Sequence, residues 1–215
     1  MVNTQDYFLA QNRPRLYIQA VQRRSMATAA KLTWPSKIPY RLTGGVRSCL
    51  TGRATAPGRA VQNKTAVRAL RAAACKVKAM KLDLSKTPCV FDTGASKGFC
   101  VTMVDCFPTI TASRAVGQRL RLTSVRRSLG VHELARLQGI VFPRTLETRQ
   151  SEVLRCIGKA MRQNVLQCTL RHLLASAGFL EQSATSLWHL AAEMVNAGLV
   201  KEPFCLPGLV YDLAK

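Results

Sequence analysis

The sequence predicts a mixed α/β chain in which short strands and a loop-rich basic region precede a set of C-terminal helices. Residues 7–21 and 88–118 are typical of strands, because short apolar runs there are bounded by turn residues. Residues 64–82 and 151–177 instead have apolar residues at three- and four-residue steps, which is the helical period. With 215 residues, 47% of them hydrophobic, the chain can bury the core of one ordinary domain or two small ones.

The stretch QNRPRLYI, residues 11–18, places Arg13 and Arg15 at the start of the first apolar run. Two arginines at the mouth of a strand can be a solvated charged end, because arginine usually lies at surfaces. A guanidinium group also presents several N–H donors in a fixed plane, which allows it to bind phosphates or the edge of a base. These eight residues alone leave both interpretations open.

Positive charge is concentrated in the first third of the chain. The formal net charge is +21, and residues 7–82 contain sixteen Lys and Arg but no acidic residue. Such a field predicts an anionic partner, which can be nucleic acid, an anionic membrane surface or an acidic protein. No apolar run approaches the roughly twenty residues of a membrane-spanning helix, so a membrane partner is the least favoured.

The first residues, MVNTQDYFLA, lack the basic and long apolar regions of a secretory signal. We therefore expect an intracellular protein that is not secreted, and a nucleic-acid partner would place it in the nucleus or nucleoid. An Arg- and Ala-rich stretch without acids is also typical of transit peptides, but this one starts too far into the chain for that interpretation to be preferred.

Residues 33–60 contain seven Pro and Gly residues, which predicts loops rather than long regular elements. Between 64 and 82 the apolar stripe comprises Val67, Leu70, Ala74 and Val77. Basic residues follow a neighbouring stripe, formed by Lys64, Arg68, Arg71, Lys78 and Lys81. This pattern predicts a basic amphipathic helix, whose charged face is either simply solvated or binds an anion.

The eight cysteines include no Cys-x-x-Cys pair and no histidine at ligand spacing, so we expect no metal site. Without an export signal they are predicted to be free thiols in a reducing compartment. Cys156 and Cys168 fall within a helical pattern and are expected in the core. None is assigned to catalysis.

Two helices are predicted after the strands, a short one around VHELARLQGI and a long one over 151–177 that Gly178 can end. The long helix has an apolar stripe formed by Leu154, Ile157, Met161, Val165, Leu166, Leu170, Leu173 and Leu174. A further helix is expected within 183–200, around Trp188.

Three stretches in order resemble the C-terminal half of the DNA cytosine-5 methyltransferases. VNTQDYFLAQNRPRLYI resembles motif VIII of that family through Gln11, Arg13 and Arg15. RSLGVHELARLQGI is similar to motif IX through Arg127, Leu129, Glu133, Ala135, Arg136, Leu137, Gln138 and Gly139. IGKAMRQNVLQ resembles motif X through Gly158 and residues 164–167. The stretch PTITASR also has a family resemblance, and the basic region lies where the family keeps its target-recognition domain.

The resemblance implies the C-terminal part of a Rossmann-like methyltransferase. Residues 1–21 would supply the motif VIII strand of the catalytic domain, and 22–126 would form a small, loop-rich target-recognition region. Residues 127–182 would be the motif IX and X helices that return to the catalytic domain, followed by a helical tail over 183–215.

The resemblance also implies contacts with double-stranded DNA. The target cytosine must leave the base stack before it can be methylated. Arg15 would lie beside this flipped base as part of the catalytic site, with Arg13 supporting it. Thr111 stands where relatives touch a phosphate, and Arg68 and Arg71 belong to the basic insert that would contact DNA.

The remaining implied roles concern the cofactor and the framework. Gly158, with Lys159, would approach S-adenosylmethionine. Gln11 would be structural, and Glu133 with Arg136 would form a structural ion pair or buried hydrogen-bonding set.

The sequence departs from the family pattern at Phe8, Ala10, Ile140 and Lys159. It also contains no Phe-x-Gly-x-Gly, Pro-Cys-Gln or Glu-Asn segment, which the family uses for the cofactor, the nucleophile and the proton donor. The one Pro-Cys pair, Pro88-Cys89, leads into a predicted strand.

We therefore expect the second half of an enzyme, inactive alone and dependent on a separate catalytic half-chain for S-adenosylmethionine chemistry. Its partner surface is expected to leave one flank of Leu154, Ile157, Met161 and Val165 uncovered. The alternative is a stand-alone, basic nucleic-acid-binding module without catalysis.

Overall fold

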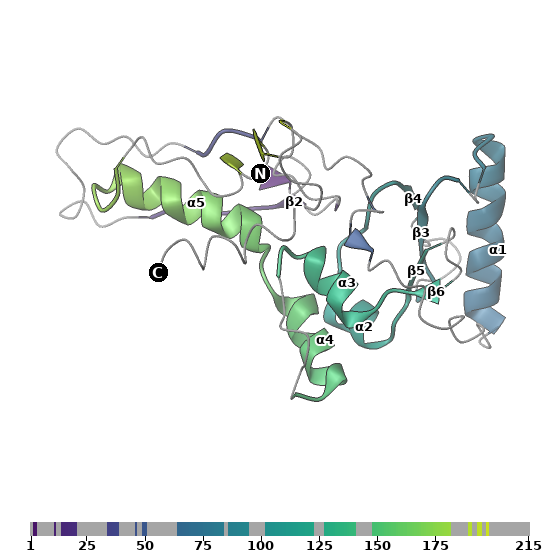
Figure 1. Cartoon of the computed structure of the whole chain (residues 1–215). Coiled ribbons are helices and arrows are strands. Elements are labelled where there is room, and N and C mark those ends of the chain that lie inside the picture. The colour runs from purple at the N-terminus through teal and green to yellow at the C-terminus, as the bar shows by residue number, and fades with distance from the viewer. Residues whose placement is uncertain are drawn as a thin grey trace.

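The computed structural model describes residues 2–3, 11, 14–20, 34–38, 46, 49–50, 64–83, 86–94, 102–122, 127–140, 148–181, 189–190, 193–194 and 197. Within these ranges it is a mixed α/β structure with one four-stranded antiparallel sheet and helices on both of its sides (Figure 1). The mixed α/β class predicted from the sequence is confirmed at this level. Among the helices of the described ranges, none combines the length and apolar character needed to cross a membrane.

The sheet has the order β4-β3-β5-β6, and every neighbouring pair is antiparallel. Its strands are β3 (Cys89–Asp92), β4 (Thr102–Val104), β5 (Leu120–Leu122) and β6 (Arg127–Ser128). All four residues of β3 are buried, as expected for a strand covered on both faces. The strands predicted within 88–118 are confirmed as β3 and β4, whereas α2 (Ala112–Val116) is a helix that the sequence reading missed.

The sheet separates two layers of helix (Figure 1). On one side α1 (Lys64–Ala79) packs against Cys89 and Phe91 of β3. On the other side lie α2, α3 (Val131–Arg136) and α4 (Gln150–Lys159), which enclose the larger core with Val90, Leu120 and Leu122. The alternation along β3 therefore sends neighbouring side chains into different cores.

The helix predicted over 64–82 is confirmed, but its buried face differs from the predicted stripe. Its buried residues are Ala66, Ala69, Ala73 and Val77. Val67, Leu70 and Ala74 are only partly buried. The small alanine side chains let the helix approach the sheet closely, so the face with the least volume is the one that packs.

The single helix predicted over 151–177 is wrong, because the chain forms two helices, α4 and α5 (Gln163–Ser176). Ala160 and Arg162 between them have extended backbone angles. A buried glutamine, Gln138, holds this break. Its side-chain amide donates to the backbone carbonyl oxygen of Ile157 at 3.1 Å, and its backbone carbonyl oxygen accepts from the backbone amide of Gln163 at 3.0 Å. These bonds replace those a continuous helix would make at the two positions.

The first predicted strand is much shorter than expected. Strand β2 (Pro14–Arg15) pairs only over two residues with β1 (Val2–Asn3), and residues 16–20 have no regular structure. Leu16 and Ile18 are 76% and 84% exposed, while Tyr17 packs against the larger core. A two-residue ladder leaves few hydrogen bonds to extend the strand.

Six cysteines lie in the described ranges, and all six are free thiols. Cys168 is buried as predicted, but Cys156 is exposed, so its assignment to the core is wrong. Cys156 lies on the exposed side of α4, whereas Ile157 and Gly158 are buried. Most of the loop-rich region 33–60 and of the predicted helix around Trp188 lies outside the described residues.

Candidate nucleic-acid interface

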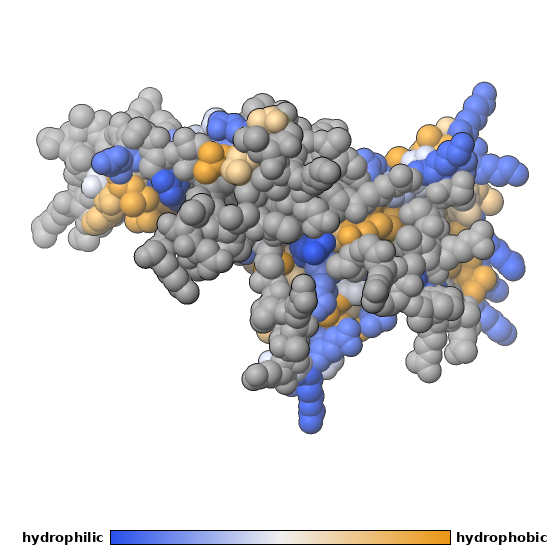
Figure 2. All heavy atoms as spheres, viewed as in Figure 1, coloured by the Kyte–Doolittle hydropathy of each residue, from blue (hydrophilic) through white to orange (hydrophobic). Residues whose placement is uncertain are grey.

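A line of positive charge runs along the side of α1 that faces away from the sheet. Lys64, Arg68, Arg71 and Lys78 are all exposed and lie on one side of the helix, opposite the buried alanines. At about 1.5 Å per residue the fourteen steps from Lys64 to Lys78 cover about 21 Å. Figure 2 shows hydrophilic side chains projecting outward at this edge of the molecule.

The charges of α1 oppose its own stability as a helix. Its sequence, KTAVRALRAAACKVKA, contains no acidic residue that could pair with them. Lys64 and Arg68 are four residues apart, and Arg68 and Arg71 are three apart, so like charges face each other along the helix. Lys64 also lies at the positive end of the helix dipole, where acidic residues are favoured. In water this arrangement of cations only destabilises the helix, whereas an anionic partner would reduce the repulsion between them.

The sheet face under α1 carries a further cation. Arg121 of β5 lies opposite Phe91 in the strand ladder and therefore on the same face of the sheet. It is partly buried, and this burial lowers the pKa of its guanidinium group from the ordinary value. The basic character of this flank thus extends from α1 to the sheet.

Thr111, predicted as a phosphate contact, is the N-cap of α2. Its hydroxyl oxygen accepts from the amide of Arg114 at 3.4 Å and lies 3.2 Å from the hydroxyl of Ser113. Since α1 and α2 lie on opposite faces of the sheet, Thr111 is not part of the line formed by Arg68 and Arg71 (Figure 1). The structure thus separates the predicted DNA contacts into two groups.

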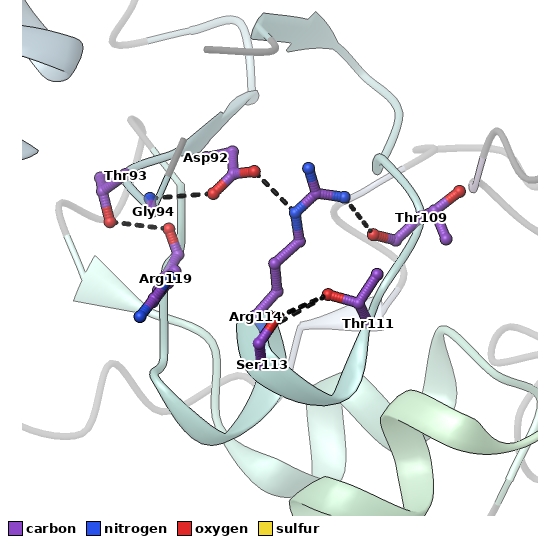
Figure 3. Close-up of polar contacts among 8 residues, drawn as sticks. All are labelled: Asp92, Thr93, Gly94, Thr109, Thr111, Ser113, Arg114 and Arg119. Carbon is purple, nitrogen blue, oxygen red and sulfur yellow. Dashed lines mark hydrogen bonds and ion pairs between the residues drawn. The ribbon is translucent and has the colours of Figure 1, made fainter. Parts of the chain in front are cut away.

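A polar cluster that the sequence reading missed joins the end of β3 to α2 (Figure 3). The Nε atom of Arg114 lies 2.6 Å from Oδ2 of Asp92, whose side chain is almost fully buried. The same guanidinium group donates to the carbonyl oxygen of Thr109 at 3.0 Å, and the amide of Gly94 donates to Oδ1 of Asp92 at 2.9 Å. This network fixes the turn after β3 against the start of α2.

Glu133, predicted as structural, forms a buried ion pair with Arg127. Both carboxylate oxygens accept from the guanidinium group at 2.6 Å, and Oε2 also accepts from the amide of Gly130 at 2.8 Å. The hydrogen bonds that Arg127 donates to Glu133 raise the pKa of Arg127, while burial acts against them. Arg136 lies partly buried in the last turn of α3. The pair therefore ties β6 to α3 through Arg127, which the sequence reading had matched to motif IX without a role.

Gly158, predicted as a cofactor contact, lies where α4 crosses α2. A Cβ atom built on it would stand 2.4 Å from the Cα and amide nitrogen of Ala112 and 2.6 Å from the carbonyl carbon of Thr111. The glycine therefore allows the two backbones to touch. Lys159, its predicted neighbour in the cofactor site, is exposed at the last position of α4.

The expectation of an uncovered apolar flank is wrong for most of the stripe. Leu154, Ile157 and Val165 are buried within the larger core of this chain. Met161 is 55% exposed, because it belongs to the break between α4 and α5. The two-helix arrangement turns the other three residues inward.

The N-terminal site residues are only partly described. Gln11 is fully buried and forms a parallel bridge with Phe107, close to the stretch that contains Thr111. Arg15 is exposed in β2, opposite Val2. Arg13 lies outside the described residues. Comparisons with protein-family models, curated proteins and solved structures found no match to this chain.

Proposed function

We propose that this chain binds double-stranded DNA as the target-recognition part of a DNA cytosine-5 methyltransferase. The observation that carries the proposal is the acid-free line of four cations on α1. Each phosphate that such a cation neutralises releases condensed counterions, and this release supplies much of the affinity of proteins for DNA. The line is long enough to meet several phosphates of one strand.

The methyltransferase role rests on the three family-like stretches and their order in the chain. Two contacts link these stretches to other parts of the fold. Gln11 forms a bridge with Phe107, and the side chain of Gln138 donates to the carbonyl oxygen of Ile157, beside Gly158. In this proposal Arg15 would lie beside the flipped cytosine, with Arg13 supporting the site. The Rossmann-like catalytic domain, and location in a nucleus or nucleoid, belong to the same proposal.

S-adenosylmethionine would supply the methyl group when bound. The backbone of Gly158 is covered by Ala112, so this glycine offers no open face to a cofactor. Lys159 is the exposed member of the pair. A complementary catalytic half would therefore have to provide most of the cofactor site, and this chain would hold and orient the DNA.

A second candidate is a stand-alone, basic nucleic-acid-binding module. The burial of Leu154, Ile157 and Val165 within this chain favours it, because the apolar stripe needs no second half to cover it. Both candidates require the same basic surface on α1, and they differ in whether methyl transfer ever occurs.

The experiment combines DNA binding with methyl transfer. The purified chain is titrated into fluorescent duplex DNA, and is then incubated with labelled S-adenosylmethionine with and without a fragment that carries the family's catalytic half. We expect the chain alone to bind DNA without incorporating label, and label to appear only with both parts. Absence of DNA binding would refute the proposal, and binding without label in the combined reaction would favour the stand-alone module.

A further inference from the structure

We propose that Arg119 is a fixed phosphate-binding residue, held by two glycines at the start of the inner strand β5. This inference rests on the proposed DNA binding and adds a contact on a turn that the charge pattern of the sequence does not single out. Arg119 is exposed and directly precedes β5.

The side chain of Arg119 occupies the space that two glycines leave open. A Cβ atom on Gly94 would lie 2.0 Å from Cδ of Arg119, and one on Gly117 would lie 2.7 Å from its Nε. The aliphatic stem therefore runs along the two glycine backbones. A long arginine side chain normally samples many rotamers in water, and this packing removes much of that freedom before any ligand binds.

The backbone of Arg119 is held as firmly as its stem. The amide and the hydroxyl of Thr93 both donate to its carbonyl oxygen at 2.8 Å (Figure 3). Its own amide donates to the carbonyl of Arg114 at 3.0 Å and closes the end of α2. The residue before it, Gln118, has a φ of 46°, a left-handed conformation that usually falls to glycine at this position. The turn thus keeps a strained conformation that fixes the direction of Arg119.

The carboxylate at this turn is already engaged by other groups. Asp92, the acid at the same turn, uses Oδ1 for the amide of Gly94 and Oδ2 for Arg114. Within the part of the chain that the structure describes, Arg119 has no ion-pair partner, in contrast to Arg114 and Arg127. A positioned cation whose donors face water is an open site for an anion from outside.

A DNA phosphate suits this geometry better than a base edge. An arginine that reads a base must extend into a groove, whereas this stem lies along Gly94 and Gly117. A phosphate can approach the surface and accept two parallel N–H bonds from a guanidinium group. The contact would position the duplex without reading its sequence.

The first test removes the charge. Binding of the full chain to several duplexes of equal length and different sequence is measured by fluorescence anisotropy over a range of salt concentrations. Arg119→Gln is expected to weaken binding roughly tenfold to a hundredfold, the effect of losing a hydrogen bond to a charged group. The slope of log K against log salt should fall by about 0.9. A loss confined to one sequence would overturn the phosphate assignment.

The second test keeps the charge and moves it. In Gly94→Ala the three atoms nearest to the new methyl group all belong to the flexible Arg119 side chain, so this side chain must shift, and we expect the fold to be kept. We expect a loss of binding similar to that of Arg119→Gln, and no further loss when both changes are combined. Gly130→Ala is the matched control, because its Cβ would meet only Glu133 Oε2, at 3.6 Å.

The outcomes separate this inference from the proposed function. If the wild-type chain does not bind DNA, the proposed function fails. If it binds and Arg119→Gln binds equally well, this inference alone fails. Additive losses in the double variant would also overturn it, because Gly94 would then act through something other than Arg119. Circular dichroism and thermal unfolding of each variant show that the comparison is between folded proteins.

Discussion

Replacing Gly158 by alanine separates two explanations for this glycine, close packing of helices and approach of a cofactor. The added Cβ would lie 2.4 Å from two backbone atoms of Ala112, whereas ordinary carbon contacts are about 3.5–4.0 Å. Helices α2 and α4 would have to separate by about 1 Å or more, because backbone atoms cannot rotate away. Overpacking of this kind costs about 1–3 kcal/mol.

Alanine also gains stability in a helix, by roughly 0.5–1 kcal/mol relative to glycine. Since the obstructing atoms are backbone, we expect the steric cost to exceed this gain and the free energy of unfolding to fall by about 1–2 kcal/mol. Urea unfolding of the wild type and of Gly158→Ala measures the change. Arg155→Ala, an exposed substitution on the same helix, is the control and should leave stability nearly unchanged.

The sign of the change in unfolding free energy distinguishes the two explanations for this glycine. A Gly158→Ala variant that is more stable than wild type would mean that the position has room for a side chain. This result would refute the packing argument. Close approach of a bound cofactor to the glycine backbone would then be the better explanation.

Three further predictions concern other parts of the chain. Glu133→Ala should lower the free energy of unfolding, measured in urea, by about 3–5 kcal/mol, because it leaves Arg127 buried without its partner. Replacing both residues by apolar ones of similar size should cost far less, and equal losses of stability in the two variants would contradict this. Arg68→Glu should raise the melting temperature, because it converts repulsion with Lys64 and Arg71 into attraction worth about 1 kcal/mol in total, while it weakens DNA binding in anisotropy titrations; a less stable variant would show that the repulsion is unimportant. Burial lowers the pKa of His189, against the opposing effects of Glu193 and a hydrogen bond with Ser36. As the pH falls through about 6.5, the imidazole is therefore protonated more readily in the unfolded chain than in the folded one, and stability is lost below that pH. His189→Gln should reduce the difference between unfolding free energies at pH 7.5 and 5.5, and an unchanged difference would exclude the effect.

The elements with a strong local period could be predicted from the sequence, but their exact faces could not. The period of α1 identified the helix and its charged side. It did not show that Ala69 and Ala73 are the residues fully buried beside Phe91, whereas Leu70 packs against this cluster but stays partly exposed. The sequence pattern predicts burial of the larger apolar residues, whereas close packing in the folded protein depends on which side chains fit the available space.

The break between α4 and α5 had no local signal in the sequence. Neither proline nor glycine lies between Lys159 and Gln163, and the apolar period continues through the break. The break depends on Gln138, whose bonds to Ile157 and Gln163 form only in the folded chain. A contact between positions nineteen residues apart cannot be read from periodicity.

The candidate site could be predicted where it depends on charge alone. The absence of acids around Arg68 and Arg71 is visible in the sequence, and both are exposed on α1. The role of Arg119 was missed because it depends partly on Gly94, a glycine on a distant segment. The Asp-Thr-Gly turn after β3 and Gly117, two residues before Arg119, are the features that could have drawn attention to it.

The most direct test of the account is the salt dependence of duplex DNA binding with and without the charges of α1. The wild-type chain is compared with a variant in which Lys64, Arg68, Arg71 and Lys78 are replaced by glutamine, and with a control that carries Arg149→Gln, Arg155→Gln and Lys159→Gln. If each of the four cations meets a phosphate, the slope of log K against log salt should fall by about 3.6 in the α1 variant. The control variant should keep most of the wild-type slope. Equal slopes for the wild type and the α1 variant would contradict the claim that this face of α1 binds DNA.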